Sequence, residues 1–452
     1  MRTLFKNTGI LASGTGNASV CGRNASNAEN RSGCFFRYIR SGFLGIDGDS
    51  IVYVDDKEPE DATGYDLIRD FTGKTLMPGF VNAHTHCPMT LLRGLGSDRP
   101  LHEWLFDYVF PAEDRLRPAD VRAGTELALL EMLSTGTTSF TDMYYMVDET
   151  AEACVSAGIK ANLTRPIQAS SPDEKPEDSY RIKEAVDLFD RWHKGGDGLI
   201  NIDFSIHAEY TCNEALVRYT SQLAAEKGAN MHIHLSETRS EHENCLAKYG
   251  KTPAEWFRDL GTFNSPTSAA HCVWVTDSDI EIMSRHGVTA VHNPESNMKL
   301  GSGFARIEAM RAAGINVALG TDGAASNNNL NMFEELHTAS VIHNGFTCDP
   351  TIMNPDYTIR MATRNGAVAQ GRFNTGMIAP GYKADIIAID MDKPHLFPNT
   401  EPLANICYSA QGSDVCMTMV NGKVLYENGE FKTLDWERIM REAAKSAEHM
   451  SI

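Results

Sequence analysis

The chain has 452 residues, of which 42% are hydrophobic and 22% charged, so it is long enough for one large globular domain and a smaller one. Its 60 acidic and 41 basic residues give a formal net charge of −19. Such a surface repels phosphate backbones and anionic lipid head groups, which excludes nucleic acid and membranes as expected partners.

The N-terminal residues and the cysteines indicate a cytoplasmic protein. Residues 1–20 lack the apolar run of a secretion signal. No stretch of the chain approaches the ~20 apolar residues of a membrane span. The ten cysteines are scattered without a C-x-x-C pair, which is typical of free thiols in a reducing compartment.

The two ends of the chain predict one small β domain. Residues 12–33 are rich in Gly, Ser and Asn, which predicts an irregular loop. Residues 43–56 alternate apolar and polar positions around a Gly-containing turn, which is a hairpin pattern. Similar patterns return at 384–392 and 416–431, with two Asn-Gly turn pairs. We therefore expect a small β-sandwich assembled from both termini.

Between these segments, short apolar runs alternate with amphipathic helical stretches such as 123–136 and 213–228. The eight runs cover residues 79–86, 137–143, 159–166, 201–210, 230–238, 268–275, 288–297 and 316–326. Most of them begin with apolar residues and end in His, Asp, Glu, Arg or Asn. Barrel strands have this pattern, because their bodies are buried and their carboxyl ends form the mouth of an active site.

The predicted fold class is therefore α/β, a (β/α)₈ TIM-type barrel with a small β-sandwich domain formed from both termini. We expect the sandwich to comprise residues 1–75 and 378–435, the barrel residues 76–377, and a C-terminal helix residues 436–452.

Histidines at two strand ends favour a metal site. His84 and His86 are two residues apart on the first strand, so their side chains point to the same face. On the fifth strand His234 lies nearer the mouth than His232, although both share a face, and we prefer His234 on that ground. A lone histidine is more often a hydrogen-bonded core residue than a ligand.

Two further strand ends favour a metal site over separate core histidines. His271 ends the sixth strand, and Asp322 ends the eighth between glycines that allow close backbone approach. Several imidazoles and a carboxylate in one barrel mouth favour a bound metal. A site of three histidines and one aspartate accepts zinc, iron or manganese.

The segments "MPGFVNAHTH", "HLSET", "AAHC" and "GTDGAASNNNLN" together resemble the amidohydrolase superfamily, and in detail its methylthioadenosine/adenosylhomocysteine deaminases. The resemblance runs from about residue 43 to the C-terminus, and "HEWLFDYVFPAEDRL" is an especially close match. The polar N-terminal stretch departs from the family pattern, which leaves the first strands of the small domain undefined.

The resemblance implies a role for each matching residue. One divalent metal ion, zinc with iron or manganese as alternatives, would be bound by His84, His86, His234 and Asp322. The catalytic residues would be Glu237 as proton shuttle, His271 beside the attacking water, and Asp322. The substrate-binding residues would be Glu113 at the ribose hydroxyls, Arg165 and Arg181 at the tail or sugar, and Trp104, His207 and Glu237 in the pocket. No lysine ends the fourth strand, so a carbamylated lysine and a second metal are not expected.

The resemblance therefore implies hydrolytic deamination of the adenine of methylthioadenosine or adenosylhomocysteine, with 5′-deoxyadenosine and adenosine as further candidates. A guanine or pterin deaminase and a triazine-type chlorohydrolase on the same scaffold remain alternatives. A non-catalytic relative would lack metal ligands, and none is missing here. The expected partner is a small purine nucleoside, and we expect a homo-oligomer, the commonest state of soluble enzymes.

Overall fold

A computed structural model describes residues 1–14 and 35–450 of the chain. Its centre is a sheet of eight parallel strands in sequence order from β6 to β13. The strands are β6 (Phe80–Thr85), β7 (Thr137–Met143), β8 (Lys160–Ile167), β9 (Ile200–Ile206), β10 (Met231–Leu235), β11 (Thr267–His271), β12 (Thr289–His292) and β13 (Val317–Leu319). Each lies within or overlaps one of the eight predicted runs, so the predicted barrel is confirmed.

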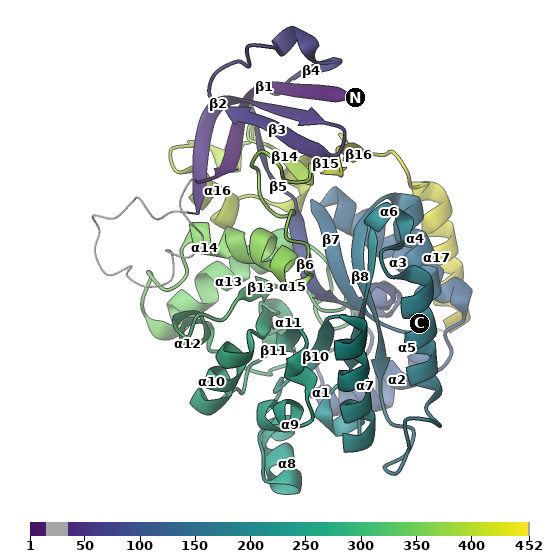
Figure 1. Cartoon of the computed structure of the whole chain (residues 1–452). Coiled ribbons are helices and arrows are strands. Elements are labelled where there is room, and N and C mark those ends of the chain that lie inside the picture. Colours follow the sequence, from purple (N-terminus) through teal and green to yellow (C-terminus); the bar gives the residue numbers. More distant parts are fainter. Residues whose placement is uncertain (15–34, 451–452) are drawn as a thin grey trace.

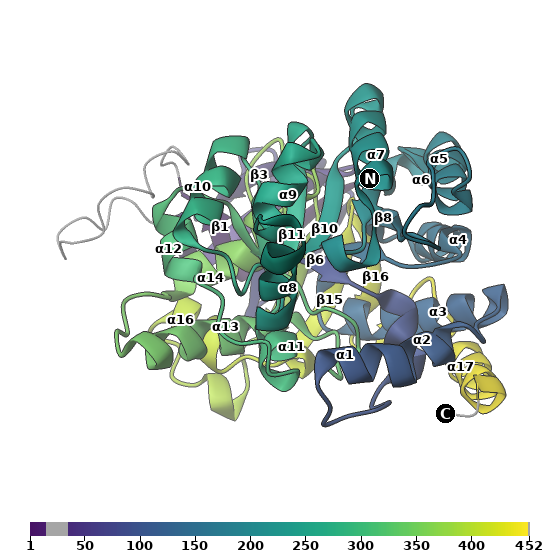
Figure 2. The same cartoon turned by 90° about the horizontal axis from the view of Figure 1, so that it is seen from below.

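Helices connect successive strands and cover the outside of the barrel (Figures 1 and 2). They are α1 (Leu101–Glu103), the π-helical segment Trp104–Val109, α2 (Phe110–Glu113), α3 (Pro118–Ser134), α4 (Val147–Ala157), α5 (Tyr180–Trp192), α7 (Glu214–Lys227), α8 (Arg239–Tyr249), α9 (Pro253–Asp259), α10 (Asp277–His286), α11 (Pro294–Lys299), α12 (Ile307–Ala312) and α13 (Met332–Thr347). In the part of the chain that the structure describes, no helix has both the length and the apolar character needed to cross a lipid bilayer.

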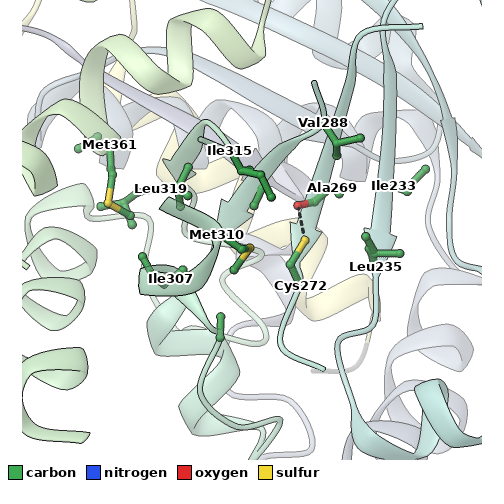
Figure 3. Close-up of a cluster of buried hydrophobic side chains, with 14 of the residues drawn as sticks. Ile233, Leu235, Ala269, Cys272, Val288, Ile307, Met310, Ile315, Leu319 and Met361 are labelled. Atoms are coloured by element: carbon green, nitrogen blue, oxygen red, sulfur yellow. Dashed lines mark hydrogen bonds between the residues drawn. The ribbon is translucent and has the colours of Figure 1, made fainter. Parts of the chain in front are cut away.

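Side-chain alternation along β10 separates the core from the site. Figure 3 shows Ile233 and Leu235 in the hydrophobic cluster between the strands and the helices, where both are fully buried. His232 and His234, which alternate with them along β10, point to the other face, because successive strand residues alternate. The same short segment therefore packs the core and supplies two histidines to the barrel interior.

Polar contacts close the barrel between its last and first strands. The Asn82 side chain in β6 donates to the Thr321 hydroxyl and accepts from the Thr321 backbone amide. One residue further on, the amide of Asp322 donates to the carbonyl oxygen of His84 at 2.9 Å. The seam thus fixes the positions of two predicted site residues relative to each other.

Strands from both chain ends form a second, nine-stranded sheet, which lies above the barrel in Figure 1. They are β1 (Arg2–Ser13), β2 (Phe36–Asp47), β3 (Ser50–Asp55), β4 (Leu67–Asp70), β5 (Lys74–Pro78), β14 (Ile386–Asp390), β15 (Val415–Val420), β16 (Lys423–Glu427) and β17 (Glu430–Phe431). Backbone hydrogen bonds join Ile51 of β3 to Gly381 and Tyr382. Residues from both chain ends also share one apolar cluster, so the termini form a single small β domain, as predicted.

Strand β1 was not predicted, although it lies in the sheet between β5 and β2. Its last residues, Ala12 and Ser13, fall in the segment 12–33 that was expected to be a loop, and the rest of that expectation lies mostly outside the described residues. β5 crosses the expected boundary at residue 75, and the domain limits stay a prediction.

The C-terminal helix α17 (Trp436–Met450) packs beside α3 (Figures 1 and 2). Its residues Ala443 and Met450 join the apolar cluster that also contains Trp104 and Leu105 of the π-helical segment. α17 and the segment Trp104–Val109 thus belong to one apolar cluster at the side of the barrel.

Candidate metal centre and active site

Four strand ends bring histidines and a carboxylate to one point. The ligand atoms of His84, His86 and His234 all lie within 4.8 Å of one another, and the same holds for His84, His271 and Asp322. All five residues are buried or nearly so. The predicted residues on or directly after β6, on β10 and β11, and after β13 therefore share one compact site.

Hydrogen bonds orient two of these imidazoles. His86 donates through Nδ1 to the carbonyl oxygen of Met143 at 2.6 Å, and His234 donates through Nδ1 to the carbonyl oxygen of His207 at 2.7 Å. Because a carbonyl accepts only, Nδ1 carries the proton when either ring is neutral, and Nε2 then has a free lone pair. Metal-binding histidines are usually held in this way.

His84 has the same orientation but a histidine partner. Its Nδ1 lies 2.8 Å from Nε2 of His232, whose Nδ1 lies 2.6 Å from the Ser268 hydroxyl. The buried Nε2 of His84 has no hydrogen-bond partner within residues 1–14 and 35–450, and lies 3.4 Å from Oδ1 of Asp322. His232 therefore orients the His84 ring through Nδ1. His234 is the fifth-strand residue whose ligand atom lies beside those of His84 and His86.

Asp322 is held by two serines. The hydroxyls of Ser296 and Ser326 donate to its Oδ2 at 2.6 and 2.7 Å, which leaves Oδ1 3.2 Å from Nε2 of His86. Although burial acts to raise the pKa of Asp322, its contacts with His84 and His86 hold it well below the ordinary value. Sequence reasoning missed both serines, although they lie in the motifs "VHNPESN" and "GTDGAAS" that mark the strand ends.

The pKa values of the three imidazoles differ, because only His86 is dominated by its contact with Asp322. Although burial acts to lower the pKa of His86, Asp322 raises it to about 9. Burial lowers the pKa of His84 to about 4 and that of His234 well below its ordinary value, so these rings are neutral. A divalent metal takes neutral imidazoles and a carboxylate as donors, so His84 and His234 can bind it directly, whereas His86 would release its Nε2 proton on binding.

The backbone at three strand ends adopts left-handed conformations. Ser236, His271 and Asp322 have φ values of 47°, 72° and 61°. Such conformations cost roughly 1–3 kcal/mol each for non-glycine residues and are concentrated at functional sites. A Cβ at Gly320 would lie 2.7 Å from the backbone nitrogen of His84, so this glycine permits the close approach expected from the sequence.

Glu237 and His271 lie on the open side of the histidine group. Nδ1 of His271 lies 2.8 Å from Oδ1 of Asn297, and its Nε2 lies 3.8 Å from Oε2 of Glu237. Burial raises the pKa of Glu237 to about 7, against the effect of His271. A carboxyl group with this pKa can both give and accept a proton near neutral pH.

A second glutamate holds the loop of Glu237. The Glu241 carboxylate accepts from the backbone amides of Ser236 at 2.8 Å, Glu237 at 2.6 Å and Thr238 at 3.3 Å. Sequence reasoning missed Glu241, but Thr238 and Glu241 form a capping box at the start of α8, a readable signal. Glu241 therefore positions Glu237 through the backbone.

A small pocket of about 50 Å³ opens beside the histidine group. Among the predicted substrate-binding residues, Trp104, Glu113, His207 and Glu237 line it. The Trp104 indole donates to the carbonyl oxygen of Leu95 at 2.9 Å, so its ring is fixed as a wall. Burial raises the pKa of Glu113 to about 7. The structure thus brings these four residues together beside His86, His234, His271 and Asp322, which line the same pocket.

Arg165 and Arg181 lie in a larger adjoining cleft of about 610 Å³. Phe110, Glu113 and Tyr145 line both the pocket and this cleft, so the two spaces are neighbours.

Arg165 lies inside β8, which continues one residue beyond the predicted run to Ile167. Its Nε donates to Glu184 of α5 at 2.8 Å, because the helix returns across the strand end and brings a carboxylate to the guanidinium. Arg181 donates to the Ser170 hydroxyl at 2.6 Å and lies over the Tyr180 ring.

Comparisons with known proteins agree with this geometry. The model of the amidohydrolase family matches residues 75–425. The 5-methylthioadenosine/S-adenosylhomocysteine deaminase of Acetivibrio thermocellus is 45% identical over 414 residues, which cover 90% of this chain and 95% of that protein. The 5′-deoxyadenosine deaminase of Methanosarcina mazei is 42% identical over 412 residues, which cover 91% and 94%.

Among solved structures, an adenosine deaminase from Xanthomonas campestris with bound zinc superposes with a TM-score of 0.89 at 31% identity, covering 99% of this chain and 98% of that one. Since the family model and these relatives span most of the sequence, the chain belongs to the amidohydrolase family.

Proposed function

We propose that this protein is a metal-dependent hydrolase that removes the exocyclic amino group from the adenine of 5′-methylthioadenosine or S-adenosylhomocysteine. The products are the inosine analogue and ammonia. 5′-Deoxyadenosine and adenosine belong to the same candidate substrate class. The names of the relatives support this choice, and the layout of the cavity is the single observation that carries it.

The groups along the cavity follow the order of the parts of such a nucleoside. The buried histidine group and Glu237 lie at the inner end, where the base would react. Glu113 lies where the pocket and the cleft meet, which suits a ribose. The cleft with Arg165 and Arg181 then suits a substituent on the 5′ carbon. A guanine or pterin ring alone would leave the cleft unused.

The metal ligands we propose are His84, His86, His234 and Asp322. The occupied Nδ1 atoms, the unpartnered Nε2 of His84 and the ionised Asp322 support one divalent ion here, which we take to be zinc, with iron or manganese as alternatives. When bound, such an ion lowers the pKa of a coordinated water to about 7 and makes hydroxide available at neutral pH.

Three side chains then carry out the proton transfers of the proposed reaction. His271 hydrogen-bonds the attacking water through Nε2, and Asp322 accepts its proton. Glu237 donates a proton to the ring nitrogen beside the attacked carbon, which relieves the negative charge that addition pushes into the ring. The proton that Asp322 accepted then passes through Glu237 to the departing amine, and the hydroxyl proton on the attacked carbon returns Glu237 to its protonated state as ammonia leaves. The buried position of Glu237 and its pKa of about 7 suit these transfers.

A substrate panel tests the proposed function. The adenine-to-hypoxanthine absorbance change should be observed with the methylthio, homocysteinyl and 5′-deoxy adenine nucleosides. Guanine, a pterin and a chlorotriazine should be turned over at least about a hundredfold more slowly, since they leave the sugar and tail groups unsatisfied. Faster turnover of any of these three would overturn the proposal.

The arginines predict a tail-specific effect. We expect Arg181→Ala to lower kcat/KM for S-adenosylhomocysteine about ten- to a hundredfold, because a carboxylate–guanidinium bond contributes roughly 1.5–3 kcal/mol. Methylthioadenosine has no carboxylate and should lose much less. Arg165 is already paired with Glu184, so Arg165→Ala should show the smaller difference between the two substrates.

The control for the arginine variants is Arg285→Ala, since Arg285 on α10 is exposed and pairs with Glu281. Equal losses on both substrates in Arg181→Ala would mean that Arg181 holds the sugar or the loop rather than the tail.

A cytoplasmic location and a homo-oligomeric state also belong to the proposal. The eight cysteines among the described residues are all free thiols, which supports a reducing compartment. Fractionation of the cells and sedimentation of the purified protein test the two statements.

A further inference from the structure

Tyr144 follows β7 and is 2% exposed. Its hydroxyl has no hydrogen-bond partner among the residues that the structure describes. Buried polar groups are nearly always satisfied, so an unpaired hydroxyl needs an explanation. Tyr144 lines the small pocket beside the histidine group, and a bound ligand would supply the missing partner there.

A second unpaired group lies in the same pocket. Oε1 of Glu113, which comes from α2, is also buried and without a hydrogen-bond partner in the described part of the chain. Burial raises the pKa of both the Glu113 carboxyl and the Tyr144 hydroxyl, and their interaction acts to lower that of the carboxyl and to raise that of the hydroxyl further. Their contact lies outside the distance and angles of an ordinary hydrogen bond, so both atoms keep the capacity to bond a ligand placed between them.

The neighbouring tyrosine, Tyr145, does have a hydrogen-bond partner for its hydroxyl. The hydroxyl of Tyr145 donates to Gln168 at 3.5 Å, and its ring faces the Arg165 guanidinium in the cleft. Tyr144 lies closer to the reacting end, with its ring centre 6.5 Å from that of His86. The position of Tyr144 therefore corresponds to the part of the substrate next to the base.

We infer that Tyr144 is a substrate-binding residue that acts with Glu113 on one ribose hydroxyl. The sugar oxygen accepts a hydrogen bond from the Tyr144 hydroxyl, and the sugar O–H donates to the Glu113 carboxylate. A hydroxyl can do both at once, whereas a carboxylate only accepts. The pair would thus select a ribonucleoside over a deoxynucleoside. This inference rests on the proposed function and identifies the groups that bind the ribose.

The test combines two variants with three substrates, and both variants should lose affinity only for substrates that carry the bridging hydroxyl. We would measure kcat and KM for 5′-methylthioadenosine and for its 2′-deoxy and 3′-deoxy analogues at pH 8, with the parent protein, Tyr144→Phe and Glu113→Gln. Tyr144→Phe should lower kcat/KM for the ribonucleoside about tenfold, mostly through KM, since one hydrogen bond to the bound substrate is lost. The same variant should cause no further loss on the one analogue that lacks the bridging hydroxyl.

Two controls separate binding from folding. Because the Tyr144 hydroxyl has no protein partner, Tyr144→Phe should leave the thermal midpoint within about 2 °C of the parent. Tyr38→Phe is the matched control: its hydroxyl bonds Thr75 at 2.8 Å in the terminal sheet, far from the pocket. Its substrate ratios should equal those of the parent protein.

Equal losses on all three nucleosides, or a lowered midpoint with unchanged ratios, would show that Tyr144 is only structural. A parent protein that does not distinguish ribose from either deoxy sugar would also overturn the inference. Failure of the proposed function has a different signature, since the parent would then turn over none of the three nucleosides.

Discussion

Asp322→Ala is expected to lower kcat/KM by at least about 10³-fold, because a proposed metal ligand and a proton acceptor are lost together. The bound metal per chain should fall with it. In the structure, Asp322 is the carboxylate that faces His84 and His86 and that Ser296 and Ser326 hold in place. The measurements are steady-state kinetics and metal analysis of the purified variant.

Two further variants make this result specific. Asp322→Asn keeps the size and the serine contacts of the side chain but removes its charge, so it should also lose most of the activity. Asp203→Asn is the matched control, since Asp203 is a buried carboxylate that Asn162 and Asn230 hold away from the pocket. Activity within a few-fold of the parent in Asp322→Ala, or two metal ions per parent chain, would contradict the proposed site.

Glu237→Gln is expected to lower kcat by roughly 10²–10⁴-fold, the usual contribution of one positioned acid or base. Gln has nearly the same shape but cannot carry the proton to the ring nitrogen. Metal content and the dissociation constant of the product inosine analogue should stay within a few-fold of the parent. The measurements are single-turnover kinetics, metal analysis and calorimetric titration of the product.

Glu126→Gln is the matched control for this variant, since Glu126 is a buried glutamate on α3 that pairs with Arg122 and Arg438. It should retain the activity of the parent. If Glu237→Gln turned over within a few-fold of the parent, another group would have to shuttle the proton. If it lost metal as well as activity, Glu237 would hold the site together rather than transfer protons.

The sequence by itself was sufficient for the barrel and for the group of residues at its mouth. In β10, the alternation of His232, Ile233 and His234 shows which residues share a face, because a strand has a period of two. Parallel strands in series bring their carboxyl ends together, so His84 and Asp322 could be expected to meet although they lie far apart in sequence.

Only the tertiary structure decided the contacts between elements. Each such contact involves segments from different parts of the chain. Examples are the bonds from Nδ1 of His86 and His234 and the pairing of Arg165 with Glu184. The same holds for the position of the Tyr144 hydroxyl beside Glu113. No periodic pattern encodes such contacts, because they depend on how helices and loops pack over the strand ends. Strand patterns report burial along one element, whereas the state of each polar atom is set by neighbours that only the folded chain supplies.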